Sequence, residues 1–316
     1  MYAEQKAGIP GSDVASGGVG PCIVLEYFGA QLPIGLKGRL SESIFRRLAR
    51  RHTDGELHTN LGIMPGLRWR IPAKQTGYAF GVPENDAAER ATLALVKCLI
   101  KTSDSFFDVG ANYGIFSVAV AASLKSRTFK IVAIEADPEL AIRLQDNVYK
   151  NGLQIDVINA AVSDVCGRAT FFRNHSDDSS GSLTTHFSSK HRTTQIDVET
   201  ITLTEILERS DVKRALIKVD VEGAGALVWN GLASGVDVAE WLIMEIIGPE
   251  SEAKLPEIIV RETGWHSYYI EDFVLREVRF SEYNYRPPFW NWLFCKANAE
   301  EVRALLHPPF KVAALA

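Results

Sequence analysis

Acidic residues at the ends of two predicted strands are the side chains whose chemistry this 316-residue chain makes easiest to interpret. Residues 105–117 read SFFDVGANYGIFS, which is an apolar strand ending in Asp108, then a tight turn, then the start of a helix. Gly110 lets the backbone reverse without a Cβ clash, and Gly114 lets the helix lie close to the strand. This strand–turn–helix pattern predicts a nucleotide-cofactor site in which the ligand approaches main-chain amides.

The residue types in this turn select among nucleotide cofactors. A dinucleotide site has glycine at the position of Asn112, and its pyrophosphate lies at the helix N-terminus, where the Asp108 carboxylate would repel it. A cationic ligand is attracted instead, and S-adenosylmethionine carries both an ammonium and a sulfonium group. We therefore predict S-adenosylmethionine as the cofactor, bound by the turn residues Asp108, Gly110, Ala111, Asn112, Tyr113 and Gly114.

Two further strands are expected to complete the cofactor site. Residues 130–135 (KIVAIE) form a buried-type strand that ends in Glu135. An acid at this position of a βαβ unit accepts hydrogen bonds from ribose hydroxyls. A third strand over residues 155–161 ends in small side chains, which leave room for an adenine ring. The residues that these strands add to the predicted cofactor site are Glu135, Ala136, Asn159, Ala160 and Ala161.

Six segments follow one another along the chain in a recognisable order, namely 108–114 (DVGANYG), 134–138 (IEADP), 159–164 (NAAVSD), 182–183 (SL), 198–203 (VETITL) and 217–223 (IKVDVEG). In this order they resemble the FkbM-type S-adenosylmethionine-dependent methyltransferases, over residues 78–296. The resemblance implies a doubly wound, mostly parallel seven-stranded sheet, a Rossmann-like class I methyltransferase fold. One position departs from the family, because Gly225 stands where a second glutamate usually follows Gly223.

The chain divides into four parts by composition and periodicity. Residues 1–18 are rich in Gly, Ala and Ser, and we expect them to be disordered. Residues 19–75 form an N-terminal substrate or cap segment, where substrate specificity is expected to lie. Residues 76–300 form the S-adenosylmethionine-binding methyltransferase domain, an α/β domain with strands and helices in alternation. Residues 301–316 are expected to be a C-terminal tail.

Within the main domain, the patterns predict further elements of secondary structure. These are helices over 84–100, 138–149 and 204–208, and strands over 169–172, 195–199, 215–219, 241–246 and 291–296. A polar run at 177–182 joins the two strands of an insertion and is either a functional lid or a floppy loop. The resemblance favours the lid, because Ser182 and Leu183 match a recurring element of the family.

Charge and cysteine content exclude several classes of protein. The net charge is −5, whereas a protein that binds DNA or RNA normally carries a strong excess of basic residues. The composition therefore does not indicate nucleic-acid binding. The four cysteines are far apart and form no Cys-x-x-Cys pair, so we expect neither zinc nor a disulfide framework. No segment reads as a signal peptide or as a membrane span, and we expect a cytoplasmic protein.

Methyl transfer to a hydroxyl group gains from a general base, which typically contributes about 10²–10⁴ in rate. Acids that could serve lie at the ends of two predicted strands: Asp220, Glu222 and Glu245. Histidines that could serve lie in the insertion: His175, His186 and His191. We predict Asp220 and Glu222 first and His186 next.

Each acid also has a structural interpretation. Asp220 could bind the ammonium group of the cofactor or orient a backbone turn, and Glu222 could cap a helix that begins at Gly223. Asp177 and Asp178 could bind magnesium together with Asp220. Adjacent acids in a serine-rich loop are common without a metal, so we expect no metal site.

The resulting hypothesis is an O-methyltransferase for a hydroxyl of a sugar or a polyketide-type natural product, with the substrate class implied by the resemblance alone. Two alternatives remain. The first is methyl transfer to a nitrogen or carboxyl group of a small molecule, which needs no strong base. The second is a catalytically degenerate protein that binds the cofactor and serves as a scaffold, which Gly225 favours.

Overall fold

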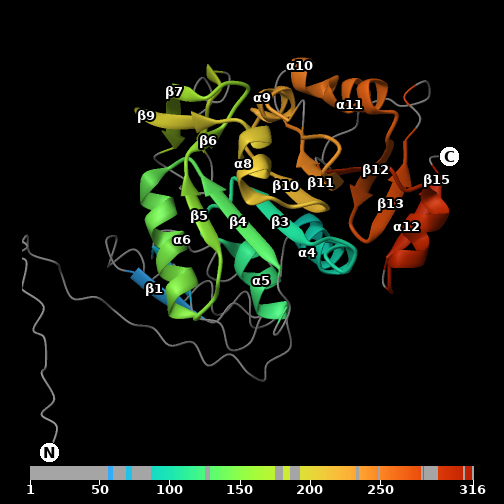
Figure 1. The fold of residues 1–316 in the computed structure, drawn as a ribbon, viewed down its shortest axis with the longest axis horizontal. Helices are drawn as coiled ribbons and strands as arrows, with labels where there is room; N and C mark the ends of the chain where they lie inside the picture. Colours follow the sequence, from blue (N-terminus) through green and yellow to red (C-terminus); the bar gives the residue numbers. More distant parts are fainter. Residues whose placement is uncertain are drawn as a thin grey trace, which may run out of the picture.

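A mixed sheet forms the centre of the protein (Figure 1). The computed structural model describes residues 56–59, 69–72, 87–124, 129–174, 181–185, 193–232, 235–247, 250–278, 280, 291–308 and 310–314. In these residues the main sheet has nine strands, in the order β15-β13-β12-β14-β11-β10-β3-β4-β5. Their bounds are β3 (Ser105–Val109), β4 (Lys130–Glu135), β5 (Asp156–Asn159), β10 (Ala215–Val219), β11 (Ala239–Glu245), β12 (His266–Glu271), β13 (Val274–Glu277), β14 (Asn291–Cys295) and β15 (Lys311–Ala314).

The strand directions divide this sheet into two parts. Strands β5, β4, β3, β10 and β11 all run parallel to one another. β14 is antiparallel to both β11 and β12, β13 is antiparallel to β12, and β15 runs parallel to β13. The expected seven-stranded sheet is therefore wrong in strand number. A two-residue turn at Asp272 and Phe273, with Asp272 at φ 50°, folds β13 back onto β12, and β13 then offers an edge to β15.

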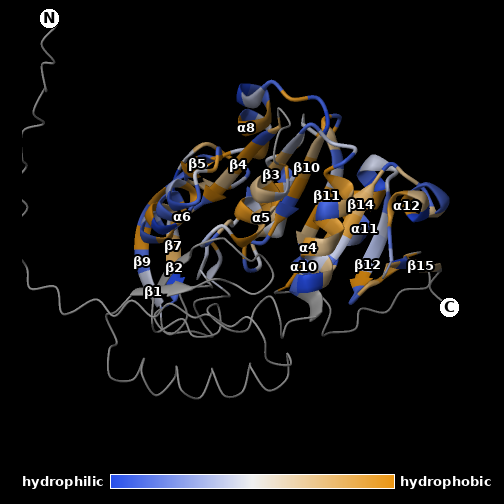
Figure 2. Ribbon diagram, turned by 90° about the horizontal axis from the view of Figure 1, so that it is seen from below, coloured by the Kyte–Doolittle hydropathy of each residue, from blue (hydrophilic) through white to orange (hydrophobic). Residues whose placement is uncertain are grey.

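Helices cover both faces of the sheet because successive strand residues point to opposite sides. In β3, Phe106 packs on one face and Phe107 on the other, and both are fully buried. The helices on the first face are α4 (Ala87–Leu99), α5 (Ile115–Ser123), α6 (Pro138–Lys150) and α12 (Ala299–Leu305). Those on the second are α8 (Leu203–Ser210), α9 (Gly225–Asn230) and α11 (Leu255–Thr263), which the short α10 (Glu250–Ala253) precedes. The doubly wound α/β fold is confirmed. Figure 2 shows both hydrophobic and hydrophilic residues in helices such as α6 and α8.

A second sheet is inserted between β5 and α8. Its strands are β6 (Ala161–Val162), β7 (Gly167–Asn174), β8 (Gly181–Ser182) and β9 (Thr193–Ile201), in the order β6-β9-β7-β8. The strands predicted over 169–172 and 195–199 lie within β7 and β9. Because β6 begins directly after β5 ends, this sheet lies at the carboxyl end of β5, beside β4 (Figure 1).

The predicted terminal parts differ in how much of them is described. β1 (Glu56–Thr59) and β2 (Trp69–Pro72) form an antiparallel pair, whereas the rest of 1–75, including the predicted disordered segment, lies outside the described residues. Residues 301–316, which we expected to be a tail, contain most of α12 and all of β15. No helix in the described part of the chain combines the length and apolarity needed to cross a bilayer.

Candidate active site

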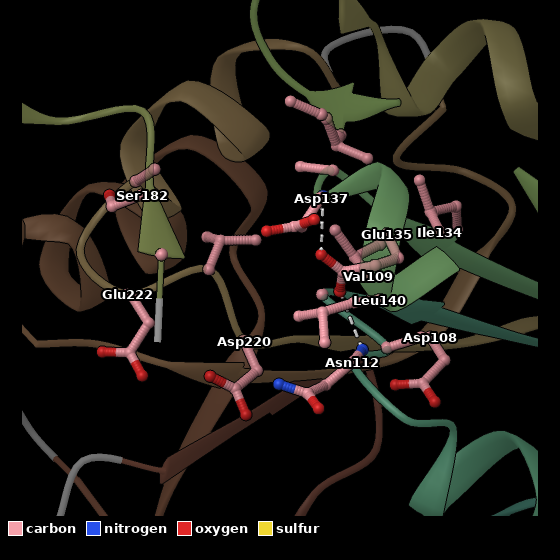
Figure 3. Close-up of a pocket in the computed structure, with 18 of the residues that line it drawn as sticks. Asp108, Val109, Asn112, Ile134, Glu135, Asp137, Leu140, Ser182, Asp220 and Glu222 are labelled. Carbon is pink, nitrogen blue, oxygen red and sulfur yellow. Dashed lines mark hydrogen bonds between the residues drawn. The ribbon is translucent and has the colours of Figure 1, made fainter. Parts of the chain in front are cut away.

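A cavity of about 280 Å³ lies at the carboxyl ends of β3, β4 and β10, beside the inserted sheet (Figure 3). Chain order reverses between β3 and β10, and ligands of open α/β sheets bind at such a switch. The acidic residues that line the cavity are Glu89, Asp108, Glu135, Asp137, Asp220, Glu222 and Glu245. Two basic residues, Arg173 and Lys218, line it as well.

The glycine turn after β3 is required by a close contact between two chain segments. Gly110 has φ +77°, and a Cβ atom there would lie 1.8 Å from the carbonyl oxygen of Asp220. The amides of Gly110 and Ala111 both donate to the carbonyl of Ile134, at 2.9 and 3.0 Å. The turn therefore joins the ends of β3, β4 and β10 through contacts within the protein itself.

Asp108 has one carboxylate oxygen that accepts hydrogen bonds from the protein and one that has no donor among the described residues. Its Oδ2 accepts hydrogen bonds from the amide and hydroxyl of Ser117 in the first turn of α5, at 3.0 and 2.5 Å. Its Oδ1 is buried without a hydrogen-bond partner among the described residues. Burial raises the pKa of Asp108, against the opposing effects of Lys218 and Ser117. A buried carboxylate oxygen of this kind suits a cationic hydrogen-bond donor.

Glu135 is fixed by the backbone on both of its carboxylate oxygens. The amide of Asn112 donates to Oε2 at 2.8 Å and that of Asp137 to Oε1 at 2.9 Å (dashed in Figure 3). Burial raises the pKa of Glu135 to about 7, although these two hydrogen bonds oppose the shift. Each oxygen keeps a further lone pair, so the carboxylate can still accept hydrogen bonds from a pair of hydroxyls.

An arginine of the inserted sheet secures the loop that holds Glu135. Asp137 caps α6 by accepting the amide of Glu139 at 2.8 Å. Arg173 of β7 donates to both carboxylate oxygens of Asp137, and to Glu139 Oε1 at 2.7 Å. We did not predict Arg173, because no sequence pattern links it to an acid 36 residues earlier.

Three carboxyl groups gather on the other side of the cavity. Asp220, Glu222 and Glu245 each place an oxygen within 4.8 Å of the others, and Figure 3 shows the first two side by side. Burial would raise the pKa of Asp220, but the Lys218 ammonium, 3.0 Å away, and a hydrogen bond from Glu245 lower it. Burial and Asp220 raise the pKa of Glu245 well above its usual range. The pKa values of the two carboxyl groups are thus pushed apart, with Asp220 the more acidic of the pair. This spacing also suits a divalent cation, a ligand we did not expect.

The loop after β10 corrects one of our interpretations. Glu222 has φ 51° and Gly223 φ 83°, and α9 begins only at Gly225. Glu222 does not cap this helix, because the free amide of Ala226 donates instead to Glu252 Oε1 at 2.9 Å. Glu252 also lies close to Gly225, because a Cβ atom at this position would be 2.9 Å from Glu252 Oε2. A side chain at position 225 would therefore force the Glu252 carboxylate to shift.

Most of the site residues that we predicted line this cavity. They are Asp108, Gly110, Ala111, Asn112, Glu135, Ala136, Ala160, Ala161, Asp220 and Glu222. Tyr113 is fully buried in the core, and Gly114 is the N-cap residue of α5 and lies against Leu144 of α6. Asn159 donates its side-chain amide to the carbonyls of Glu135 and Ala136 and does not line the cavity.

Other predicted residues lie outside the described part of the chain. They are His186 with His175 and His191, and the acids Asp177 and Asp178. Conversely, Lys218 lies inside the segment 217–223 that we had singled out, yet we gave it no role. The available signal was a lysine within an otherwise apolar strand, a position where charge is rare unless it is paired.

Comparison with known proteins gives one family match. The model of the methyltransferase FkbM domain matches residues 108–287. No curated protein matches the chain.

Three similar solved structures are described by their sequence identity, the share of each chain that is covered and the TM-score. A human methyltransferase 10 domain containing protein is 11% identical, with 84% of this chain and 98% of that chain covered and a TM-score of 0.41. The METTL16 MTase domain is 12% identical, with coverages of 83% and 81% and a TM-score of 0.44. A methyltransferase FkbM from Methylobacillus flagellatus KT is 12% identical, with coverages of 80% and 70% and a TM-score of 0.41.

Proposed function

The chain belongs to the FkbM methyltransferase family, and we therefore propose that it is an S-adenosylmethionine-dependent O-methyltransferase for a hydroxyl of a sugar or a polyketide-type natural product. One observation carries the proposal. A single cavity has the fixed acids Asp108 and Glu135 on one side and the hydrogen-bonded pair Asp220 and Glu245 on the other. Methyl transfer to a hydroxyl uses both features, a place for a cationic cofactor and an acceptor for a proton.

The residues on the first side fit S-adenosylmethionine. The unpartnered Oδ1 of Asp108 suits its ammonium group, and the remaining lone pairs of Glu135 suit its two ribose hydroxyls. The apolar side chains of Ile134, Leu140 and Ala160 line the same cavity and suit the adenine ring. When bound, this cofactor supplies an electrophilic methyl group whose bond to sulfur breaks with the electron pair going to sulfur.

The residues on the other side suit an acceptor hydroxyl. Asp220 is ionised, so its carboxylate can take the hydroxyl proton as the new oxygen–carbon bond forms. Glu222 is held at φ 51°, a backbone conformation that is costly for a residue with a side chain. Strain of this kind concentrates at functional sites, which supports a role for Glu222 in positioning the acceptor.

A second candidate is transfer to an amine, which the charge of the cavity favours. Seven acidic and two basic residues line it among those described, and Arg173 already binds Asp137 and Glu139. Such a surface attracts a protonated amine as well as the cofactor. The ionised Asp220 could then remove the proton that makes the amine unreactive.

A matched assay tests both candidates. We would incubate the protein with S-adenosylmethionine and separate panels of hydroxylated glycosides, polyketide lactones and amines, with and without a chelator, and measure methylated product. We expect product from a hydroxyl acceptor, and we expect Glu222→Gln to keep cofactor affinity while it slows transfer by about 10²-fold, because the acceptor is positioned less well.

The exposed acid Glu208 on α8 provides the control, so Glu208→Gln should behave as the unmodified protein. Product from amines alone would establish the second candidate. Loss of product with the chelator would assign a metal to the three carboxylates. Cofactor binding without any product would support the scaffold alternative.

A further inference from the structure

Lys218 is a buried cation at the floor of the cavity. It lies in β10, is 4% exposed and lines the cavity, and its ammonium lies 4.3 Å from the ring centroid of Phe116 on α5. Burying an ammonium costs several kcal/mol unless carboxylates compensate for the lost water. A lysine here therefore needs a reason beyond packing, because an apolar side chain would fill the same space at lower cost.

The sheet register places Lys218 beside Asp108. The two residues are direct partners in the parallel pairing of β10 with β3. Phe106 and Leu216, two positions earlier in each strand, pack on the face covered by α4 and α5. Because side chains alternate along a strand, Asp108 and Lys218 project to that same face. The ammonium is thereby held next to the carboxylate that faces the cofactor side.

The same ammonium also pairs with the acid on the acceptor side. Its distance to Asp220 Oδ2 is 3.0 Å. Burial lowers the pKa of Lys218, but Asp220, Asp108 and Glu89 together raise it above its usual value, so the lysine stays charged. Among the described cavity residues, the other cation is Arg173, which binds Asp137 and Glu139.

We propose that Lys218 is a positioning residue that couples the two sides of the cavity, holding Asp108 for the cofactor and Asp220 for the acceptor, both charged and in place. This inference rests on the proposed function for its division into two sides. It assigns Lys218 no contact with either ligand. The groups that face this arrangement are Asp108 on β3, Asp220 after β10, Glu89 on α4, Glu245 on β11 and Glu222 in the loop before α9.

The first arm of the test uses the protein without ligand. Aspartate would be labelled with ¹³C at the carboxyl carbon, and the signals of Asp108 and Asp220 would be followed by NMR across the pH range, with a chelator present, in the unmodified protein and in Lys218→Met. We expect the pKa of Asp220 to rise in Lys218→Met, because its counter-charge is gone. Lys213→Met, which changes an exposed lysine just before β10, should leave the titration unchanged.

The second arm measures affinity for S-adenosylmethionine by calorimetry at several pH values. We expect Lys218→Met to bind at least about tenfold more weakly at neutral pH and to recover part of this loss as rising pH ionises Asp108 again. A merely structural role would weaken binding by the same factor at every pH. Such a parallel loss, or an unchanged titration of Asp220, would overturn the proposal.

Two safeguards keep the outcome readable. If Lys218→Met fails to fold, Lys218→Arg takes its place, and we expect it to keep the low pKa of Asp220 because the charge remains. Independently of any variant, a carboxyl of Asp220 that titrates at or above its usual range in the unmodified protein contradicts the proposal. The first arm requires no methyl transfer. A protein without activity would therefore contradict the proposed function, while the titration of Asp220 would still decide the role of Lys218.

Discussion

Gly110 and Gly114 show that one glycine motif can serve two different contacts. At Gly110 the missing side chain admits the carbonyl of Asp220, so the first glycine of the turn joins β3 to the loop after β10. At Gly114 the missing side chain admits Leu144 of α6, which would lie 2.3 Å from a Cβ atom. Both glycines also have positive φ, at +77° and +88°, where a side chain adds strain. The packing of the protein itself therefore requires both glycines, independently of any ligand.

Replacement of Gly110 should be far more damaging than replacement of a glycine with similar backbone geometry. Gly110→Ala forces the loop of Asp220 to move, and we expect it to cost about 2–4 kcal/mol in the free energy of unfolding and to remove measurable cofactor binding. Gly152 has φ +62° with no atom near its Cβ position, so Gly152→Ala should cost about 1 kcal/mol and keep binding. Chemical denaturation and calorimetry would measure both, and equal effects would refute the role of the contact.

The buried Glu135 should make the stability of the ligand-free protein fall as the pH rises. Its pKa is about 7 when folded and 4.5 in its ordinary state, so the folded protein holds this proton more tightly than the unfolded chain. The resulting stability is complete below about pH 4.5 and is lost as the pH passes 7, by about 3 kcal/mol at most. Glu135→Gln removes this contribution. Denaturation curves from pH 4.5 to 8 should therefore show a flatter profile for the variant, and parallel profiles would contradict the assignment.

The inserted sheet is a wall of the cavity as well as a candidate lid. Phe171, Arg173 and Ser182 come from β7 and β8, and all three line the cavity. Arg173 attaches this wall to Asp137 at the start of α6, and the amide of Asp137 in turn holds Glu135. A strand in one sheet thus fixes a carboxylate at the end of a strand in another. The described part of the insertion is anchored by ion pairs, whereas residues 175–180, where the polar run begins, lie outside the described residues.

Removal of the Arg173 contact should loosen this wall and weaken the cofactor site together. In Arg173→Met, we expect faster amide hydrogen exchange in β7 and β8 and about tenfold weaker cofactor binding, because Asp137 loses two hydrogen bonds. The matched control is Arg209→Met, which breaks an exposed pair with Glu205 within α8. It should change neither measurement. Weaker binding without faster exchange would show that Arg173 acts on the ligand directly.

The molecule extends well beyond the strands that surround the cavity. The strand-end acids of the cavity come from β3, β4, β10 and β11, whereas β12, β13 and β15 lie on the far side of β14. Tyr268 and Ile270 of β12 share the core with α4, whereas the outermost edge adds packing of its own, such as the edge-to-face contact of Phe273 with Phe310 at 5.2 Å. Stability in the outer strands and ligand binding at the inner ones should therefore be separable.

A truncation after residue 308 tests this separation. It removes β15 and Phe310, and we expect a loss of about 1–3 kcal/mol in the free energy of unfolding, with a melting temperature lower by several degrees. Cofactor affinity should stay within twofold of the full chain. A shorter truncation that removes only residues 315 and 316 serves as the control. A large loss of affinity in the first truncation would show that the edge of the sheet supports the cavity.

Elements with strong local patterns were predicted with accurate bounds. The strands over 130–135 and 215–219 coincide with β4 and β10, because continuous apolar runs with branched residues specify buried parallel strands. The strand predicted over 155–161 is instead divided at Ala160 between β5 in the main sheet and β6 in the inserted one. Local propensity does not state which neighbour a strand will pair with, and the same limit applies to β12, β13 and β15.

Local properties of the chain were sufficient for the order of strands and helices, the acids at the strand ends and the family resemblance, because each depends on residues close together in sequence. Packing alone decided that Lys218 lies between Asp108 and Asp220. It also decided that Arg173 donates to Asp137 and that Glu252 accepts the amide of Ala226 in the first turn of α9. Apart from the ion pair of Lys218 with Asp220, two residues away, these contacts join residues distant in sequence, through register, helix approach and burial. No periodic pattern encodes such distances, so the charge arrangement of the cavity is a property of the folded protein.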